Sequence, residues 1–354
     1  MLCAFTERDV TSTPPRPTTG SLGAGSPRPP IAKREPTVRE LHGETVIDAY
    51  AWMKDRTSAA VEAHLAAENA HTAAALAHLA PHAERIFEEI RHRTQETDTS
   101  VPVRHGAYWY VVRTEEGRQY PVSCRRVGRA DGPEQILLDV NVLAVASPYF
   151  ALGVHEVSPD HRWLAYSTDH TGGERYTLHV RDLATGGDLA DRIEDTASSV
   201  AWSRDGSQLL YTRADDAHRP YQVWCHRVGT APSTDVLVFE EDDERFNVDV
   251  DLTRSEEWIV VHSASHTTSE AWLIDAAAPG TPPRCVRPRA PGVEYWVDHE
   301  RGVDGGTLVL LTTEDAPNRR VATAPARDPP PGPTPSATAP RCRSMPSTSS
   351  PVTG

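Results

Sequence analysis

The chain has 354 residues, of which 38% are hydrophobic, and a net charge of −14. The length allows two or three domains of about 150 residues each. The acidic balance argues against a nucleic-acid binder, because nucleic acids are bound mainly by neutralising their phosphates. The charge is compatible with cationic peptides or amines as ligands, although most acidic proteins are acidic only for solubility.

The five cysteines are scattered, and no two of them form a Cys-x-x-Cys pair. This usage indicates free thiols in a reducing compartment. No apolar run approaches the roughly 18 residues that a membrane span needs. The opening text, MLCAFTERDVTSTPPRP, lacks the apolar core of a secretory signal. We therefore expect a cytoplasmic protein that has neither a membrane nor a nucleic acid as its partner.

Residues 1–35 are rich in Pro, Thr, Ser and Gly. Such a segment buries too little apolar surface to offset the entropy lost on ordering. The composition predicts a disordered tail, or text that precedes the true start codon.

Residues 36–95 are expected to form an N-terminal extension with two helices. An extended segment, ELHGETVIDAYAWMKD, comes first. The first helix then runs from Ser58, a candidate N-cap, to Leu79. Pro81 is well suited to the first turn of the second helix, which ends near Arg93 and completes an α-helical hairpin.

Each helix carries an apolar stripe. In the first helix the stripe consists of Val61, Leu65, Leu76 and Leu79. In the second helix, Ile86, Phe87 and Ile90 are expected to form the buried face.

Residues 101–326 show the alternating period of β-strands. The stretch HGAYWYVVRTEEGRQYPVSCRRVG, residues 105–128, predicts two strands joined by a turn at Glu115–Gly117. A turn-and-strand phrase then occurs three times: VSPDHRWLAYSTD (157–169), VAWSRDGSQLLYTRAD (200–215) and VDLTRSEEWIVVHSAS (250–265).

The equivalent positions in the three phrases are Ser158, Ser203 and Thr253, so the spacings are 203 − 158 = 45 and 253 − 203 = 50 residues. Each phrase is followed by a polar turn, a second strand and a turn with Gly. A period of this length with about four short strands is typical of a propeller blade. With the 105–128 hairpin and a last unit around GTLVLLTT, residues 306–313, we count about five blade-like units.

Residues 327–354 no longer follow this pattern. Pro, Ser and Thr dominate, and large apolar residues are almost absent. We expect a disordered tail. Its origin is either a frameshift near codons 327–333 of a GC-rich gene or a natural low-complexity sequence.

The order and wording of these phrases resemble the N-terminal part of oligopeptidase B (protease II) sequences, within the prolyl oligopeptidase family of serine peptidases. The resemblance covers roughly residues 36–328 and also includes FEEDDERFNVDVDLTRSEEWIVVHSASHTTSEAWLID. It implies a seven-bladed propeller that caps an α/β-hydrolase domain, with the N-terminal extension lying against that domain. It also implies cleavage of short peptides after Arg or Lys, with the propeller excluding large folded substrates.

The sequence departs from the family pattern at the catalytic centre. The family's nucleophile sits in a G-x-S-x-G turn, followed in the chain by Asp and His, and no G-x-S-x-G occurs in the 354 residues. No catalytic, cofactor-binding or metal-binding residue is therefore assigned, and no cofactor is expected. About five of seven blades cannot close a ring, so an unpaired edge and an uncovered blade face should lower solubility.

Other polar groupings are better explained by structure than by function. His64, His71, His78 and His82 lie near the first helix, but a metal site needs convergent ligands. The acidic run EEDDERFNVDVD, residues 240–251, does not fit the calcium-loop pattern and suggests a solvated loop that leads into a strand, with attraction of basic peptides as the alternative. Gly172–Gly173 and Gly186–Gly187 are expected in hairpin turns.

Five tryptophans recur at blade positions and are expected to pack between blades: Trp163, Trp202, Trp224, Trp258 and Trp272. Altogether the sequence predicts a mainly β protein. An α-helical hairpin precedes an incomplete β-propeller of about five of seven blades, and both tails are Pro-rich.

The leading functional hypothesis is an N-terminal fragment of an oligopeptidase B-like serine endopeptidase that is inactive alone. Short basic peptides are its expected ligands, and a separate hydrolase-domain polypeptide is a candidate partner. The alternatives are a stand-alone propeller that binds proteins and a hydrolase with an unrecognised site.

Overall fold

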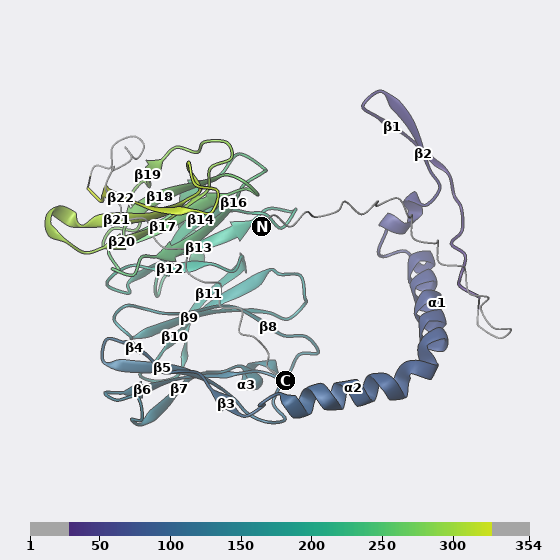
Figure 1. Ribbon diagram of the computed structural model, residues 1–354, viewed down its shortest axis with the longest axis horizontal. Helices are drawn as coiled ribbons and strands as arrows, with labels where there is room; N and C mark the ends of the chain where they lie inside the picture. Colours follow the sequence, from purple (N-terminus) through teal and green to yellow (C-terminus); the bar gives the residue numbers. More distant parts are fainter. Residues whose placement is uncertain (1–27, 328–354) are drawn as a thin grey trace, which may run out of the picture. The chain divides into compact units, whose positions relative to one another are not determined.

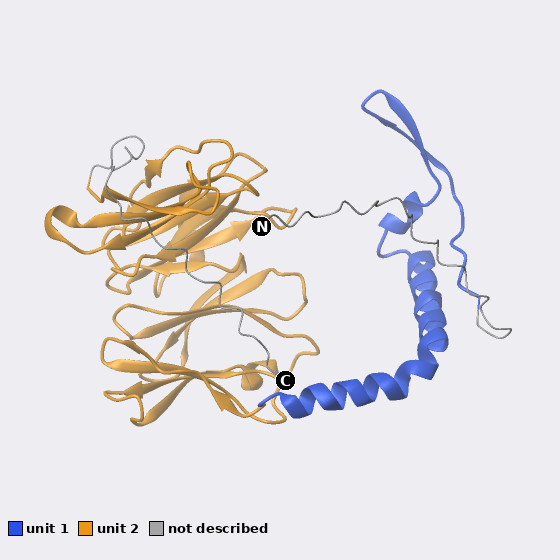
Figure 2. Cartoon of the chain, in the orientation of Figure 1, with its two compact units in different colours: residues 1–95 blue, residues 96–354 orange. Residues whose placement is uncertain are grey.

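The computed structural model describes residues 28–327 and divides the chain into two compact units, residues 1–95 and 96–354 (Figure 2). Residues 1–27 and 328–354, which hold most of the predicted disordered tails, lie outside the described residues. Each unit is described by itself below.

Unit 1 contains a β-hairpin followed by helices (Figure 1). Its elements are β1 (Thr37–Leu41), β2 (Glu44–Asp48), the 3-10 helix η1 (Ala51–Lys54), α1 (Ala59–Leu76), the 3-10 helix η2 (Ala77–Leu79) and α2 (Ala80–Arg93). The indole nitrogen of Trp52 donates a hydrogen bond to the Lys33 carbonyl over 3.0 Å, which ties the segment before β1 to η1.

The predicted pair of helices is confirmed. Ser58 occupies the N-cap position of α1, although its side chain makes no capping hydrogen bond. Pro81 lies in the first turn of α2, where its missing amide hydrogen costs nothing. Figure 1 shows α2 bending away from the axis of α1 at η2.

The expectation that α2 buries its apolar face is wrong for the described chain. Ile86, Phe87 and Ile90 are 43%, 56% and 60% exposed. The physical reason is that an amphipathic helix buries its stripe only where another element packs over it. In α1 only Val61 is buried.

Unit 2 consists, over the described residues, of five antiparallel sheets that follow one another in chain order (Figure 1). Blade 1 contains β3 (Asp98–Thr99), β4 (Val103–His105), β5 (Tyr108–Thr114), β6 (Val122–Val127) and β7 (Glu134–Asp139), and is followed by α3 (Val140–Ala144). Blade 2 contains β8 (Ala151–Val157), β9 (Trp163–Asp169), β10 (Tyr176–Asp182) and β11 (Asp188–Thr196).

Blades 3 and 4 repeat the four-stranded arrangement. Blade 3 contains β12 (Val200–Trp202), β13 (Gln208–Ala214), β14 (Pro220–Arg227), the 3-10 helix η3 (Pro232–Thr234) and β15 (Val236–Glu240). Blade 4 contains β16 (Asn247–Leu252), β17 (Trp258–Ala264), β18 (Ser269–Asp275) and β19 (Arg284–Arg287).

Blade 5 has three strands: β20 (Tyr295–Glu300), β21 (Thr307–Thr312) and β22 (Arg320–Pro325), with the 3-10 helix η4 (Val303–Gly305) between the first two. The predicted count of five blade-like units is therefore confirmed. Both predicted glycine pairs lie in hairpin turns of blade 2.

The core of unit 2 lies between neighbouring sheets, because alternate residues of a strand point to opposite faces. In β9, Trp163 and Ala165 pack toward blade 3, whereas Leu164 and Tyr166 pack toward blade 1. All seven residues of β9 are buried. The five tryptophans predicted to pack between blades all take part in such clusters.

The three equivalent positions of the sequence repeat make the same hydrogen bonds. The hydroxyl oxygens of Ser158, Ser203 and Thr253 each accept a backbone N–H five residues ahead, over 2.9, 2.9 and 3.2 Å. Their backbone amides donate to the carbonyls of the same partner residues. The repeat is thus a turn that a side chain locks, and it starts the second strand of blades 2, 3 and 4.

None of the helices within residues 28–327 combines the length and the apolar character that a membrane crossing needs.

Candidate functional site

A recess in unit 2 lies where the first strands of several blades face each other. Its volume is about 560 Å³, and its walls come from β4 and β5 of blade 1, β8 of blade 2 and β16 of blade 4. A second recess of about 350 Å³ continues along β16 toward β20 and shares Asp251 and Arg254 with the first. We call these two recesses together the axial recess.

Carboxylates without a cationic partner line the axial recess. Burial, and secondly the charge of Asp251, raises the pKa of Glu156 from 4.5 to about 7. Burial also raises the pKa of Asp251 and of Asp249. Glu156 is open to solvent within the recess, but surrounding protein atoms displace much of its water. Among the described residues, none of these three carboxylates forms an ion pair.

At the wall of the recess, side-chain contacts join blades that are far apart in the sequence. His105 Nε2 lies 2.5 Å from Glu256 Oε1, which joins blade 1 to blade 4. The ring of His161, from blade 2, meets His105 edge-on at 4.6 Å between centroids. The Tyr110 hydroxyl lies 2.8 Å from His161 Nδ1.

His161 has a lowered pKa in this contact, because burial and the neighbouring His105 both disfavour its charged form. A neutral ring can accept a hydrogen bond from the Tyr110 hydroxyl, so the turns of blades 1, 2 and 4 meet in one polar contact. His105, Tyr110 and Glu256 all line the recess, so this contact fixes part of its wall.

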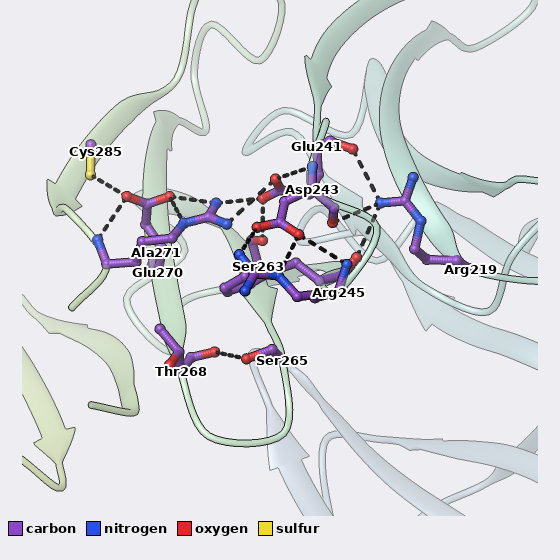
Figure 3. A network of polar contacts seen from close by, with 12 residues as sticks. Arg219, Glu241, Asp243, Arg245, Ser263, Ser265, Thr268, Glu270, Ala271 and Cys285 are labelled. Carbon is purple, nitrogen blue, oxygen red and sulfur yellow. Dashed lines mark hydrogen bonds and ion pairs between the residues drawn. The ribbon is translucent and has the colours of Figure 1, made fainter. Parts of the chain in front are cut away.

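A second polar site is a network centred on Arg289, whose partners are shown in Figure 3. Its guanidinium lies 2.5 Å from Glu241 and 2.8 Å from Glu270, and both carboxylates belong to residues only 6% exposed. Ser263 donates a further hydrogen bond to Glu241 over 2.6 Å. The guanidinium also stacks on Phe246, 3.9 Å from the ring centre.

Within the network, the positive charge of Arg289 offsets the effect of burial on Glu241. Burial by itself would raise the pKa of Glu241, but the hydrogen bonds from Arg289 and Ser263 outweigh it and the net shift is downward. Arg219 donates to the backbone carbonyls of Glu241, Asp243 and Phe246 (Figure 3). These contacts fix the loop between blades 3 and 4, so the network is better suited to scaffolding than to ligand binding.

The acidic run of residues 240–251 contains both types of site. It leads into β16 as predicted, but Glu241 differs from the predicted solvated loop because it is buried and paired with Arg289. Asp249 and Asp251 come from the same run and line the axial recess. No local sequence pattern indicates this division, since Arg289 and Ser263, the partners of Glu241, lie 48 and 22 residues away.

The predicted helix histidines are not brought into one cluster. His64 lies 3.7 Å from Glu68, and His82 lies 2.7 Å from Arg85. Within residues 28–327, no three His, Cys, Asp or Glu side chains are grouped so as to hold a metal ion.

Radially repeated four-stranded antiparallel sheets, with an axial recess at their first strands, define the class of β-propeller proteins. Comparison with known families is more specific. Residues 29–335 match the family described as "Prolyl oligopeptidase, N-terminal beta-propeller domain". The chain belongs to this family.

The similar proteins are longer than this chain. Protease 2 of Moraxella lacunata is 36% identical over 306 residues, which is 84% of this chain and 44% of that protein. Dipeptidyl aminopeptidase BI of Pseudoxanthomonas mexicana is 35% identical over 331 residues, 87% of this chain and 45% of that protein. The chain thus spans less than half the length of these relatives.

Solved structures agree with the sequence matches. Oligopeptidase B from Leishmania major superposes with a TM-score of 0.75 at 29% identity, covering 84% of this chain and 44% of that one. Oligopeptidase B from Trypanosoma brucei, with covalently bound antipain, superposes with a TM-score of 0.76 at 29% identity. This match covers 85% of this chain and 45% of that one. The predicted resemblance to oligopeptidase B is confirmed, and this chain corresponds to the N-terminal propeller part.

Proposed function

We propose that this chain is the propeller part of an oligopeptidase B-like serine peptidase that cleaves short peptides after Arg or Lys. The observation that carries the proposal is the family match over residues 29–335, together with coverage of only 44% of the similar Protease 2. The 354 residues contain no G-x-S-x-G sequence. A serine peptidase needs its nucleophile, base and orienting acid in one site, so the chain by itself is proposed to be inactive.

The axial recess supports the preference for basic peptides. Glu156, Asp249 and Asp251 present carboxylates without cations, and desolvation makes their negative charges costly. A guanidinium or ammonium group that enters the recess relieves this cost. A recess of about 560 Å³ accommodates one or two side chains of a peptide rather than a folded protein.

The first test measures peptide hydrolysis and covalent labelling of a nucleophilic serine. The 354-residue chain is incubated with a fluorogenic Arg-containing dipeptide and with a serine-reactive phosphonate. We expect no turnover and no labelling. Turnover that the phosphonate blocks would show that the chain carries its own nucleophile.

The second test measures binding of a short Arg-containing peptide by calorimetry. The control peptide carries citrulline, the neutral isostere of Arg. We expect Arg-dependent binding that weakens several-fold in the double variant Glu156→Gln, Asp251→Asn. Equal binding of both peptides would exclude the recess as a cation site.

The second candidate function is a stand-alone propeller that binds cationic peptides without cleaving them. The same unpaired carboxylates favour it. Binding without turnover fits both candidates, and they differ in whether the chain gains activity when a hydrolase-domain polypeptide is added. A gain of activity supports the peptidase, and no gain supports the binding module.

A further inference from the structure

Blade 5 differs from blades 2, 3 and 4 at its outer edge. Those blades have four strands each, whereas the described part of blade 5 has three, in the order β20-β21-β22. β22 pairs with β21 from Arg320 to Pro325, and no other described strand pairs with it. Its second edge is therefore free in the described chain.

The register shows which backbone groups point to this free edge. The amide of Ala326 donates to the Gly306 carbonyl over 3.1 Å, in line with the pairing of Thr307 with Pro325. In an antiparallel pair, hydrogen-bonded and non-hydrogen-bonded residue pairs alternate. The N–H and C=O groups of Val321 and Thr323 therefore point away from β21. Pro325 directs only its carbonyl there, because it has no N–H.

The chain after Pro325 differs in composition from the segments that lead to the fourth strand in blades 2, 3 and 4. In blades 2, 3 and 4 that strand starts 6 to 9 residues after the third one ends. The corresponding text after Pro325 includes DPPPGPTP, residues 328–335, in which five of eight residues are proline. Proline cannot donate to a ladder and is avoided inside sheets.

β22 is complementary to itself around Thr323. In an antiparallel pair of two copies related by a two-fold axis, Thr323 lies opposite the partner's Thr323, and these two exchange N–H···O bonds in both directions. Val321 then lies opposite the partner's Pro325 and donates its N–H to that carbonyl. Because Pro325 has no N–H, this pair lacks only the reciprocal bond from Pro325 to the Val321 carbonyl.

Side chains agree with this pairing. Val321 is 43% exposed and points to the same face as Leu311, 39% exposed, and Trp296, 37% exposed. Arg320 is held by Glu314 and points to the other face, whereas the guanidinium of Arg319 lies 4.4 Å from the ring centre of Trp296. A Thr–Thr cross-strand pair is favourable, whereas the same register sets Arg319 opposite the partner's Arg327 just beyond the strand ends, which opposes the pairing.

We propose that β22 is the docking edge for β22 of a second copy of this chain, so that the three strands of each blade 5 join into one sheet across a two-fold axis. The pairing uses backbone groups that the described chain leaves unused.

The test is analytical ultracentrifugation of the full chain over a range of concentrations. We expect a monomer–dimer equilibrium, with the mass approaching twice 38.8 kDa. Thr323→Pro removes an N–H that β21 does not use, so it leaves the internal ladder intact. It should raise the dimer dissociation constant at least about tenfold, because two intermolecular hydrogen bonds are lost.

The matched control is Thr323→Val, which keeps the amide and the β-branched shape and should change the dissociation constant less than about twofold. A chain that stays monomeric at all concentrations overturns the proposal. So does a dimer that Thr323→Pro leaves unchanged.

A further variant covers the case in which Thr323→Pro does not fold, as judged by circular dichroism. Thr323→Lys keeps the backbone and places two like charges opposite each other, a common way to block an edge strand. It should weaken the dimer, and high salt should partly restore it. A dimer indifferent to this lysine contradicts the proposal.

Discussion

Blade 3 and helix α2 carry apolar patterns of similar regularity, yet their burial is opposite. Leu209, Leu210 and Tyr211 of β13 are all 0% exposed, because blades 2 and 4 cover the two faces of blade 3. In α2, Phe87 and Ile90 are more than half exposed. A periodic pattern predicts which face is apolar, and only a neighbouring element decides whether that face is buried.

The largest expected effect is at the Arg289 network. Arg289→Met keeps an unbranched apolar stem but leaves Glu241 and Glu270 buried without their cation. Breaking a buried ion pair from one side costs about 3–5 kcal/mol of unfolding free energy. Urea denaturation at neutral pH measures the loss.

The control for this variant is Arg245→Met. Arg245 also pairs with a carboxylate, Asp243, but its side chain is 81% exposed. An exposed pair contributes little to stability, because water and salt screen its charges. Equal losses in the two variants would mean that burial does not set the strength of these pairs.

The next effect is in the core between blades 3 and 4. Leu210→Ala removes buried methyl groups from a sealed cluster and should cost about 2–5 kcal/mol. The measurement is the same urea titration, read by tryptophan fluorescence. A loss below about 1 kcal/mol would mean that blade 3 is not covered on both faces in solution.

A smaller effect concerns pH and Glu156. A carboxyl whose pKa rises from 4.5 to about 7 on folding binds more protons in the folded state between these values. The stability that it contributes is full below pH 4.5 and is lost as the pH rises through about 7.

Glu156→Gln removes this titration. The variant should therefore be close to the parent in stability near pH 4.5 and more stable near pH 8. Thermal melts across this range give the comparison, and parallel profiles would show that Glu156 is not desolvated by the recess.

The smallest effect is expected in α2. Phe87→Ser replaces a side chain that is 56% exposed, so the unfolding free energy should change by no more than about 0.5 kcal/mol. Hydrogen exchange of α2 in the full chain measures the local change. A loss near that of Leu210→Ala would mean that α2 packs against a further surface in solution.

The blades could be predicted from the sequence because their determinants are local. The Ser158 hydroxyl accepts a hydrogen bond from a residue only five positions ahead. Ser203 and Thr253 make the same bond at the same separation. Strands of alternating residues then follow at once. Reading such a repeat requires no knowledge of distant contacts.

The polar sites could not be predicted because their partners are remote. The His105–Glu256 contact joins residues 151 positions apart, and Arg289 lies 48 positions from Glu241. No short spacing encodes either pair. The apolar face of α2 was recognised correctly, but its burial was not, since burial depends on an element that the pattern itself does not contain.

The locked turns also have a consequence for synthesis on the ribosome. Successive locked turns start 45 and 50 residues apart. Each lies in a sheet whose strands follow one another directly in the chain. At a translation rate of about 5–20 residues per second, a new blade emerges roughly every 2–10 seconds. Hairpins form within microseconds, so each blade can be complete before the next one is made. The nascent chain can then grow as a stack in which every finished sheet is the template for its successor.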